Sequence, residues 1–220
     1  MNGPPGDDGG RSYNFTGSQR RARRRGSPTP YALPTGPANR LRIIGGRYRG
    51  RIVRIPLVRD LRPTPDRVRE TLFNWLGQDL SGRSCLELFA GSGALSLEAI
   101  SRGASVAVAV DHSRAAIDAL RDTAATWGAD TLEAHVAGAQ SFIKAETRRF
   151  DVIFLDPPFR DNAWEWLLPA CAARLAPDGF VYAEAPVRLL PPSPLVPWRS
   201  DKAGQVHFHL FRAPARDGAG

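Results

Sequence analysis

The chain has 220 residues, a formal net charge of +8 and a sequence pI near 10.4. This length suffices for one domain with a substantial core, and the charge favours a polyanionic partner. Cys85 and Cys171 show neither metal nor redox spacing, which favours a reducing compartment. No apolar run is long enough to span a bilayer, and the first residues lack the apolar core of a secretory signal. We therefore expect a cytoplasmic protein that does not interact with membranes.

The first 38 residues are rich in Gly, Pro, Ser and Arg, with five arginines between positions 20 and 25. Such a composition cannot bury enough apolar surface to fold, so residues 1–38 are predicted to be a disordered basic tail. Two interpretations remain open for it, an RNA-binding arm and a variable solvated tail. A second short tail is expected at residues 214–220.

Residues 39–60 predict a β-hairpin extension, with strands at 41–44 and 47–55 on a Gly45-Gly46 turn. The segment is unusually rich in arginine. Arginines interleaved with Tyr48 are typical of a surface that contacts phosphates and bases, although a solvated polar face would look the same. The candidate RNA-binding residues here are Arg42, Arg47, Arg49 and Arg51.

The third segment, residues 61–213, is predicted to be the main domain. Its first helix is expected to have Thr64 as N-cap, Pro65 in the first turn and Gly77 after its end. Arg62 and Arg67 lie away from the apolar stripe and are further candidates for RNA binding. The stripe is expected to comprise Val68, Leu72, Trp75 and Leu76.

A glycine loop follows the predicted strand 85–88 and opens a helix at 94–100. A strand, a glycine turn and a helix form the first half of a mononucleotide-binding unit, and dinucleotides also bind such loops. Glu87 favours a different ligand, because a carboxylate at this strand end suits a cation such as the sulfonium of S-adenosylmethionine. The candidate cofactor-binding residues of this stretch are Glu87, Phe89, Ala90, Gly91 and Gly93.

Two further strands are predicted to end beside this loop. The strand 104–110 ends at Asp111, whose two carboxylate oxygens can accept both ribose hydroxyls. A helix at 113–126 leads to the strand 131–137, which ends at Gly138 and Ala139. At this position adenine usually binds in methyltransferases, and Gly138 offers only backbone contacts.

The strand 150–155 delivers Asp156-Pro157-Pro158-Phe159, the most specific motif of the chain. Two prolines remove two amide donors, so Asp156 and the neighbouring carbonyls present only acceptors. Such an array recognises an exocyclic amine, and Phe159 offers an aromatic face for a flipped base. A dehydrogenase has no use for this turn, so the motif favours a methyltransferase with Asp156, Pro157 and Phe159 at its catalytic site.

The rest of the chain predicts a helix at 164–175, a turn at 177–179 and strands at 180–184 and 206–211. His207 and His209 lie two apart on one strand, but no third ligand follows them. Solvated histidines are therefore expected, and no metal site.

Five blocks of the chain together resemble the RsmD-type 16S ribosomal RNA guanine-N2 methyltransferases. They are residues 42–46, 62–76, 89–95, 156–159 and 202–206. The resemblance implies an α/β fold with the doubly wound, Rossmann-like seven-stranded sheet of class I methyltransferases. It also implies S-adenosylmethionine as donor, with 16S ribosomal RNA or the small ribosomal subunit as partner. We expect a monomer.

The acceptor turn predicts a mechanism without a protein nucleophile. Asp156 and the Pro157 carbonyl would orient the guanine amine for direct displacement, and positioning supplies most of the acceleration. Either Asp156 or water takes the released proton. Two alternatives remain open, a DNA adenine amino-methyltransferase and a non-catalytic RNA-binding relative.

Overall fold

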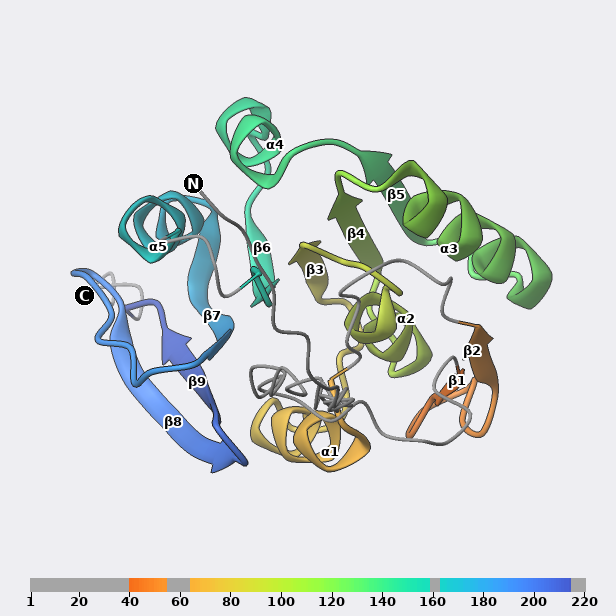
Figure 1. Ribbon diagram of the computed structural model, residues 1–220, viewed down its shortest axis with the longest axis horizontal. Helices are drawn as coiled ribbons and strands as arrows, with labels where there is room; N and C mark the ends of the chain where they lie inside the picture. Colours follow the sequence, from red (N-terminus) through yellow and green to blue (C-terminus); the bar gives the residue numbers. More distant parts are fainter. Residues whose placement is uncertain (1–39, 55–63, 159–162, 215–220) are drawn as a thin grey trace, which may run out of the picture. The chain divides into compact units, whose positions relative to one another are not determined.

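The computed structural model describes residues 40–54, 64–158 and 163–214, all within a compact unit that spans Pro37–Gly220 (Figure 1). The predicted tail at residues 1–38 lies outside the described residues. The same holds for Arg62 and Phe159, two of the predicted site residues.

The main feature is a seven-stranded sheet with the order β5-β4-β3-β6-β7-β9-β8. The first five strands in this order are parallel; β9 pairs antiparallel with β7, and β8 pairs antiparallel with β9 at the edge of the sheet. The strand order reverses between β3 and β6, which is where ligands bind in open α/β sheets. The strands are β3 (Ser84–Leu88), β4 (Val106–Asp111), β5 (Leu132–Val136), β6 (Phe150–Leu155), β7 (Leu175–Ala185), β8 (Val196–Ala203) and β9 (Val206–Arg212).

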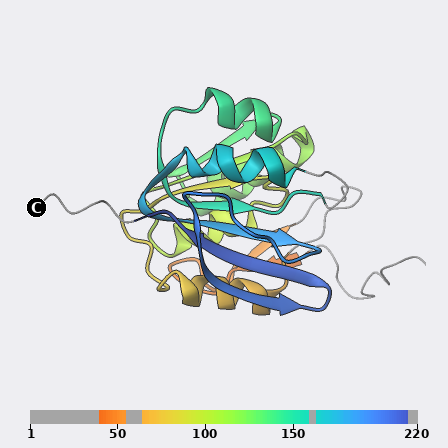
Figure 2. The same ribbon diagram turned by 90° about the vertical axis from the view of Figure 1, so that its left-hand side faces the viewer.

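Helices cover both faces of the sheet (Figures 1 and 2). One apolar core unites the hairpin with α1, α2, α3 and one face of the sheet, and a second core unites α4 and α5 with the other face. This confirms the predicted doubly wound α/β fold with seven strands. The helices are α1 (Asp66–Trp75), α2 (Ala94–Ser101), α3 (Arg114–Trp127), α4 (Ala139–Ala145) and α5 (Trp164–Ala172).

Strands β7 and β8 and helix α4 differ from the sequence prediction. The edge strand β8 and the seven-residue helix α4 were not predicted individually, and seven of the eight residues of β8 are exposed, so no alternation of buried side chains marks it. Strand β7 begins at Leu175, and the predicted turn at 177–179 forms an irregularity within it. There the register with β6 changes from Phe150 opposite Leu175 to Val152 opposite Phe180.

The hairpin consists of β1 (Arg40–Arg42) and β2 (Ile52–Arg54), paired antiparallel. The predicted Gly45-Gly46 two-residue turn is wrong, because residues 43–51 form a longer loop. This loop docks on α2: the amide of Gly45 donates to a carboxylate oxygen of Glu98 at 2.7 Å. A Cβ on Gly46 would lie 1.7 Å from the Ser101 carbonyl oxygen, so the close approach requires glycine there.

Helix α1 also differs in detail from its prediction. Thr64 does not cap it, since its hydroxyl donates instead to Glu184 at 2.9 Å and the N-cap residue is Pro65. Trp75 is only half-buried, and its ring stacks on Phe208 at a centroid distance of 5.3 Å. Phe73 is fully buried and was not in the predicted stripe.

Candidate functional site

Three neighbouring strands bring the predicted cofactor and acceptor residues together at their carboxyl ends. Leu88 on β3 lies opposite Val110 on β4 and opposite Leu155 on β6. The glycine loop, Asp111 and Asp156 therefore leave the sheet side by side. The strand order reverses between two of these strands, β3 and β6.

The glycine loop has an unusual backbone. Phe89, Gly91 and Gly93 have φ angles of 63°, 51° and 67°, in the left-handed region. For Phe89 this conformation is costly, and such strain is concentrated at functional sites. A Cβ on Gly93 would lie 2.5 Å from the methyl carbons of Leu120, so a larger residue there would have to displace that buried side chain as well as adopt a left-handed φ.

Glu87 lies at the end of β3 and is almost fully buried. One of its carboxylate oxygens accepts hydrogen bonds from the Ser96 amide at 2.9 Å and the Ser96 hydroxyl at 2.5 Å. Burial raises the pKa of Glu87 to about 7, against the lowering effect of these bonds, and the charge of Asp111 adds to the rise. Its hydrogen-bond donors among the described residues are neutral, so the carboxylate suits a cationic ligand.

Asp111 ends β4 and joins two turns through its carboxylate. One oxygen accepts from the Gly91 amide at 2.8 Å and the other from the Ser113 amide at 2.7 Å. Each oxygen has a second lone pair, which leaves acceptor capacity for the two hydroxyls of a ribose.

The third strand end, after β5, lies beside Asp111. The Ala137 amide donates to the Asp111 carbonyl at 2.9 Å, which places the exposed Gly138 and the buried Ala139 next to that strand end. A Cβ on Gly138 would meet only the Ser141 hydroxyl, at 3.5 Å, so the site has room above this backbone.

The acceptor turn follows β6, with Asp156 half-buried, Pro157 buried and Pro158 exposed. A second carboxylate, missed in the sequence, lies at the end of the neighbouring strand β7. Glu184 is buried and accepts a hydrogen bond from the Tyr182 hydroxyl at 2.8 Å. A carboxylate that closes an apolar strand, as Glu87 does, was the signal that could have revealed it.

Neither the cysteines nor His209 adds chemistry to this end of the sheet. Burial raises the pKa of Cys85 to about 12 and also raises that of Cys171, so neither supplies a thiolate. His209 is buried rather than solvated as predicted, because its ring stacks between His207 and Phe211 and accepts from the Leu189 amide. The described residues contain no cluster of three or more His, Cys, Asp or Glu side chains that could hold a metal.

None of the helices in the described part of the chain is long and apolar enough to cross a membrane.

The hairpin arginines lie away from the glycine loop. The Arg47 amide donates to the carbonyl of Ser101, the last residue of α2, whereas the glycine loop precedes its first residue. An eight-residue helix is about 12 Å long, so the two regions lie at opposite ends of α2. Arg67 is exposed on the first turn of α1, close in sequence to Thr64, and thus lies nearer the acceptor turn.

Tyr48 does not present its ring to solvent, which contradicts its predicted role in base contacts. The residue is 5% exposed, its ring packs on Trp127 at 5.4 Å and its hydroxyl donates to the Gly128 carbonyl. The arginines around it are exposed. Arg51 lies 5.0 Å from the Tyr48 ring centroid and 5.5 Å from that of Trp127, and Arg47 lies 4.5 Å from Tyr48.

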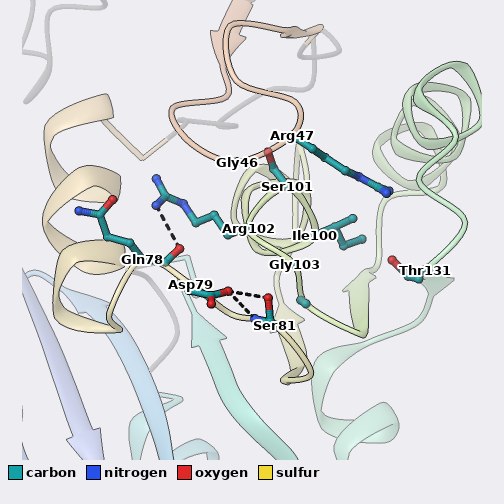
Figure 3. A pocket seen from close by; sticks show the side chains of 11 residues that line it. Gly46, Arg47, Gln78, Asp79, Ser81, Ile100, Ser101, Arg102, Gly103 and Thr131 are labelled. Carbon is teal, nitrogen blue, oxygen red and sulfur yellow. Dashed lines mark hydrogen bonds between the residues drawn. The ribbon is translucent and has the colours of Figure 1, made fainter.

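A hollow of about 440 Å³ lies at this far end of α2 (Figure 3). Arg102 points toward Gln78 and donates to its carbonyl, while Arg47 reaches away toward α3. The Arg102 guanidinium is also paired with Glu98 at 2.8 Å. With Arg47 and Arg102 in its lining, the hollow suits the cationic sulfonium of the predicted cofactor less well than the strand ends, where carboxylates gather.

Glu98 forms a buried ionic cluster that the sequence prediction also missed. Its side chain is fully buried and accepts from the Ile44 and Gly45 amides at 2.8 and 2.7 Å. It also pairs with Arg102 and with the fully buried Arg69, the latter at 3.4 Å. A glutamate within the apolar helix 94–100 was the sequence signal.

The chain is similar to known proteins over most of its length. The family described as Conserved hypothetical protein 95 matches residues 41–212. The chain is 37% identical over 194 residues to Ribosomal RNA small subunit methyltransferase D of Escherichia coli K12, covering 81% of this chain and 93% of that protein. The protein of the same name from Haemophilus influenzae is 34% identical over 180 residues, covering 78% and 93%.

Solved structures give the same relationship. The Escherichia coli protein yhhF superimposes with a TM-score of 0.74 at 38% identity, over 80% of this chain and 99% of that one. An RNA methyltransferase from Salinibacter ruber in complex with S-adenosyl-L-homocysteine has a TM-score of 0.56 at 18% identity, over 72% and 97%, which shows a common fold. The chain belongs to the RsmD-type family of ribosomal RNA small subunit methyltransferases.

Proposed function

We propose that the protein transfers a methyl group from S-adenosylmethionine to the exocyclic N2 amine of a guanine in 16S ribosomal RNA. The observation that supports this most is the register of β3 and β6, which sets the glycine loop beside the Asp156 turn. In this proposal a cofactor half-site and an amine-acceptor half-site lie side by side at the carboxyl ends of neighbouring strands. The relatives named above carry the ribosomal RNA part of the proposal.

The cofactor half-site uses the residues around the glycine loop. S-adenosylmethionine supplies an electrophilic methyl group on a sulfonium. The buried Glu87 carboxylate balances positive charge, and Asp111 accepts the ribose hydroxyls. The backbone of Phe89, Ala90, Gly91 and Gly93 forms the loop against which the cofactor lies. Gly138 and Ala139 flank the adenine.

In the acceptor half-site, Asp156 and the Pro157 carbonyl accept the amine hydrogens. This orientation directs the nitrogen lone pair at the methyl group, because the amine is otherwise a weak nucleophile. No covalent protein intermediate is required. Phe159 lies outside the described residues, and its stacking role is part of the proposal.

For RNA binding we propose the exposed arginines of the hairpin together with Arg67 on α1. Arg62 belongs to this set by sequence only. Because the hairpin loop lies at the far end of α2, the RNA would contact the protein at two separate places. The hairpin arginines of this set are Arg42, Arg47, Arg49 and Arg51.

The deciding experiment is nucleoside mass spectrometry after incubation with labelled S-adenosylmethionine and undermodified small ribosomal subunits or their RNA. We expect N2-methylguanosine at an unstacked guanine, since the base must swing into the pocket. Methylated adenine from DNA, with no methylguanosine from ribosomal RNA, would establish the DNA enzyme instead. Cofactor binding without transfer to any RNA would support a non-catalytic relative.

Asp156→Ala tests the acceptor assignment. We expect transfer to fall by at least about a hundredfold, the usual effect of losing one positioned polar group. Cofactor affinity, measured by calorimetry, should stay nearly unchanged. More than about a tenth of the wild-type rate would show that the amine is held elsewhere.

A further inference from the structure

A buried hydrogen-bonded group lies beside the acceptor turn and has no role in the chemistry described so far. Glu184 on β7 is 5% exposed, and a single carboxylate oxygen accepts from both the Tyr182 hydroxyl at 2.8 Å and the Thr64 hydroxyl at 2.9 Å. Thr64 immediately precedes α1, so this oxygen joins the end of the sheet to the start of that helix. Two hydroxyl donors on one oxygen fix the carboxylate in place.

The register of the sheet sets this group next to Asp156. Leu155 on β6 lies opposite Ala183 on β7, so Asp156 and Glu184 each follow one step after a paired residue. Neighbouring strands lie about 4.8 Å apart. The pKa of the Tyr182 hydroxyl is raised by burial and also by the charges of Glu184 and Asp156, which agrees with this proximity.

We propose that Glu184, held by Tyr182 and Thr64, is a positioning residue for methyl transfer that acts beside Asp156. The inference rests on the proposed function, in which Asp156 binds the amine. As the carbon–sulfur bond breaks and the nitrogen–carbon bond forms, sulfur keeps the electron pair and positive charge passes to the amine. The amine then loses its proton to Asp156 or water. A second fixed carboxylate stabilises this charge. It also holds the end of β7 in place beside the acceptor turn.

Glu184→Gln is the test, because glutamine keeps an oxygen for both hydroxyls and removes the charge. We expect kcat to fall about ten- to a hundredfold, from the loss of one nearby charge in a site of low dielectric constant. The KM for S-adenosylmethionine should rise no more than severalfold, by the loss of the same charge, and the melting temperature should stay close to wild type. Tyr182→Phe, which removes one donor and keeps the ring and the charge, should lower kcat less.

A binding measurement provides a readout independent of turnover. Sinefungin carries an ammonium group where S-adenosylmethionine carries the methyl sulfonium, whereas S-adenosylhomocysteine is neutral there. Glu184→Gln should reduce the preference for sinefungin over S-adenosylhomocysteine severalfold. The matched control is Asp178→Asn, at the opposite end of β7 and paired with Arg212, which should change neither kcat nor this preference.

Two results would overturn the inference. One is a Glu184→Gln enzyme with at least half of the wild-type kcat and an unaltered ligand preference. The other is a loss of kcat that follows a lowered melting temperature, which would make Glu184 purely structural. Either result leaves the proposed function intact if the wild-type protein still produces N2-methylguanosine, whereas failure of the wild-type assay refutes the function itself.

Discussion

Two buried glutamates, one near each end of α2, have different hydrogen-bond partners. At the near end, Glu87 accepts hydrogen bonds from the amide and hydroxyl of Ser96. At the far end, Glu98 is neutralised by Arg69 and Arg102 and binds two amides of the hairpin loop. Burying a carboxylate without a cationic partner is costly, so we propose that Glu98 belongs to the scaffold and that Glu87 is retained because a ligand supplies the missing charge.

This difference predicts which end of α2 governs stability and which governs cofactor binding. The far end holds the hairpin on the domain through Glu98, Ser101 and Gly46. The near end forms the glycine loop, whose backbone is strained at Phe89. Substitutions at the two ends should therefore separate into two classes.

The largest effect is expected for Glu98→Ala. It leaves the fully buried Arg69 and two loop amides without this acceptor, and removing one partner of a buried ion pair costs about 3–5 kcal/mol. Urea unfolding measures the loss, and S-adenosylmethionine affinity of the folded fraction should change little. Asp118→Ala is the control, since its exposed pair with Arg121 is worth less than about 1 kcal/mol. Equal effects of the two substitutions would contradict the scaffold role of Glu98.

The next effect is a pH dependence that originates at Glu87. Its pKa is about 7 in the folded protein and near 4.5 in the unfolded chain, so the folded state retains a proton that the unfolded state releases. Stability from this group is thus present below pH 4.5 and is lost as the pH rises to about 7, by about 3 kcal/mol at most. Glu87→Gln should abolish this part of the loss and weaken binding of the cationic cofactor.

Urea unfolding between pH 4 and 8 measures the effect of Glu87. Glu146→Gln is the control for the pH window, because Arg148 lowers the pKa of Glu146 to about 2 and its contribution is lost only as the pH falls from 4.5. An identical slope between pH 4.5 and 7 in wild type and Glu87→Gln would show that the carboxylate is not costly.

The same contrast explains what the sequence could predict. Strand ends are visible in sequence because apolar runs stop at a polar residue, which is how Glu87, Asp111 and Asp156 were found. The hairpin loop was not predictable in this way. Its conformation depends on Glu98 and Ser101, more than fifty residues away, and local turn propensity at Gly45-Gly46 favoured a tight turn that these contacts exclude. The pairing of Thr64 with Glu184 likewise joins residues 120 positions apart.

A smaller effect is expected for Asp111→Ala at the near end. Loss of the proposed acceptor for the ribose hydroxyls should weaken S-adenosylmethionine binding by about 1–3 kcal/mol, as measured by calorimetry. The substitution also frees the Gly91 and Ser113 amides, so the melting temperature should fall modestly. Ser113→Ala is the control: it removes the cap of α3 at a cost of about 1 kcal/mol in stability and should leave cofactor affinity unchanged. An unchanged dissociation constant for Asp111→Ala would remove this residue from the site.

The smallest effect is expected for the hairpin arginines, which test whether the far end of α2 also binds RNA. Arg47, Arg49 and Arg51 are exposed and cluster on one loop, so each is expected to contact a phosphate without touching the cofactor. Replacing each by Gln should reduce the slope of log affinity against log salt by about one unit per lost contact. Arg49 gives the clearest test, because Arg47 and Arg51 also stack on the Tyr48 ring and their loss disturbs packing as well as charge. Arg148→Gln removes a charge held by Glu133 and Glu146 and should leave the slope unchanged. If Arg49→Gln and Arg148→Gln give the same slope as wild type, the hairpin is a solvated face, and the far end of α2 serves the scaffold alone.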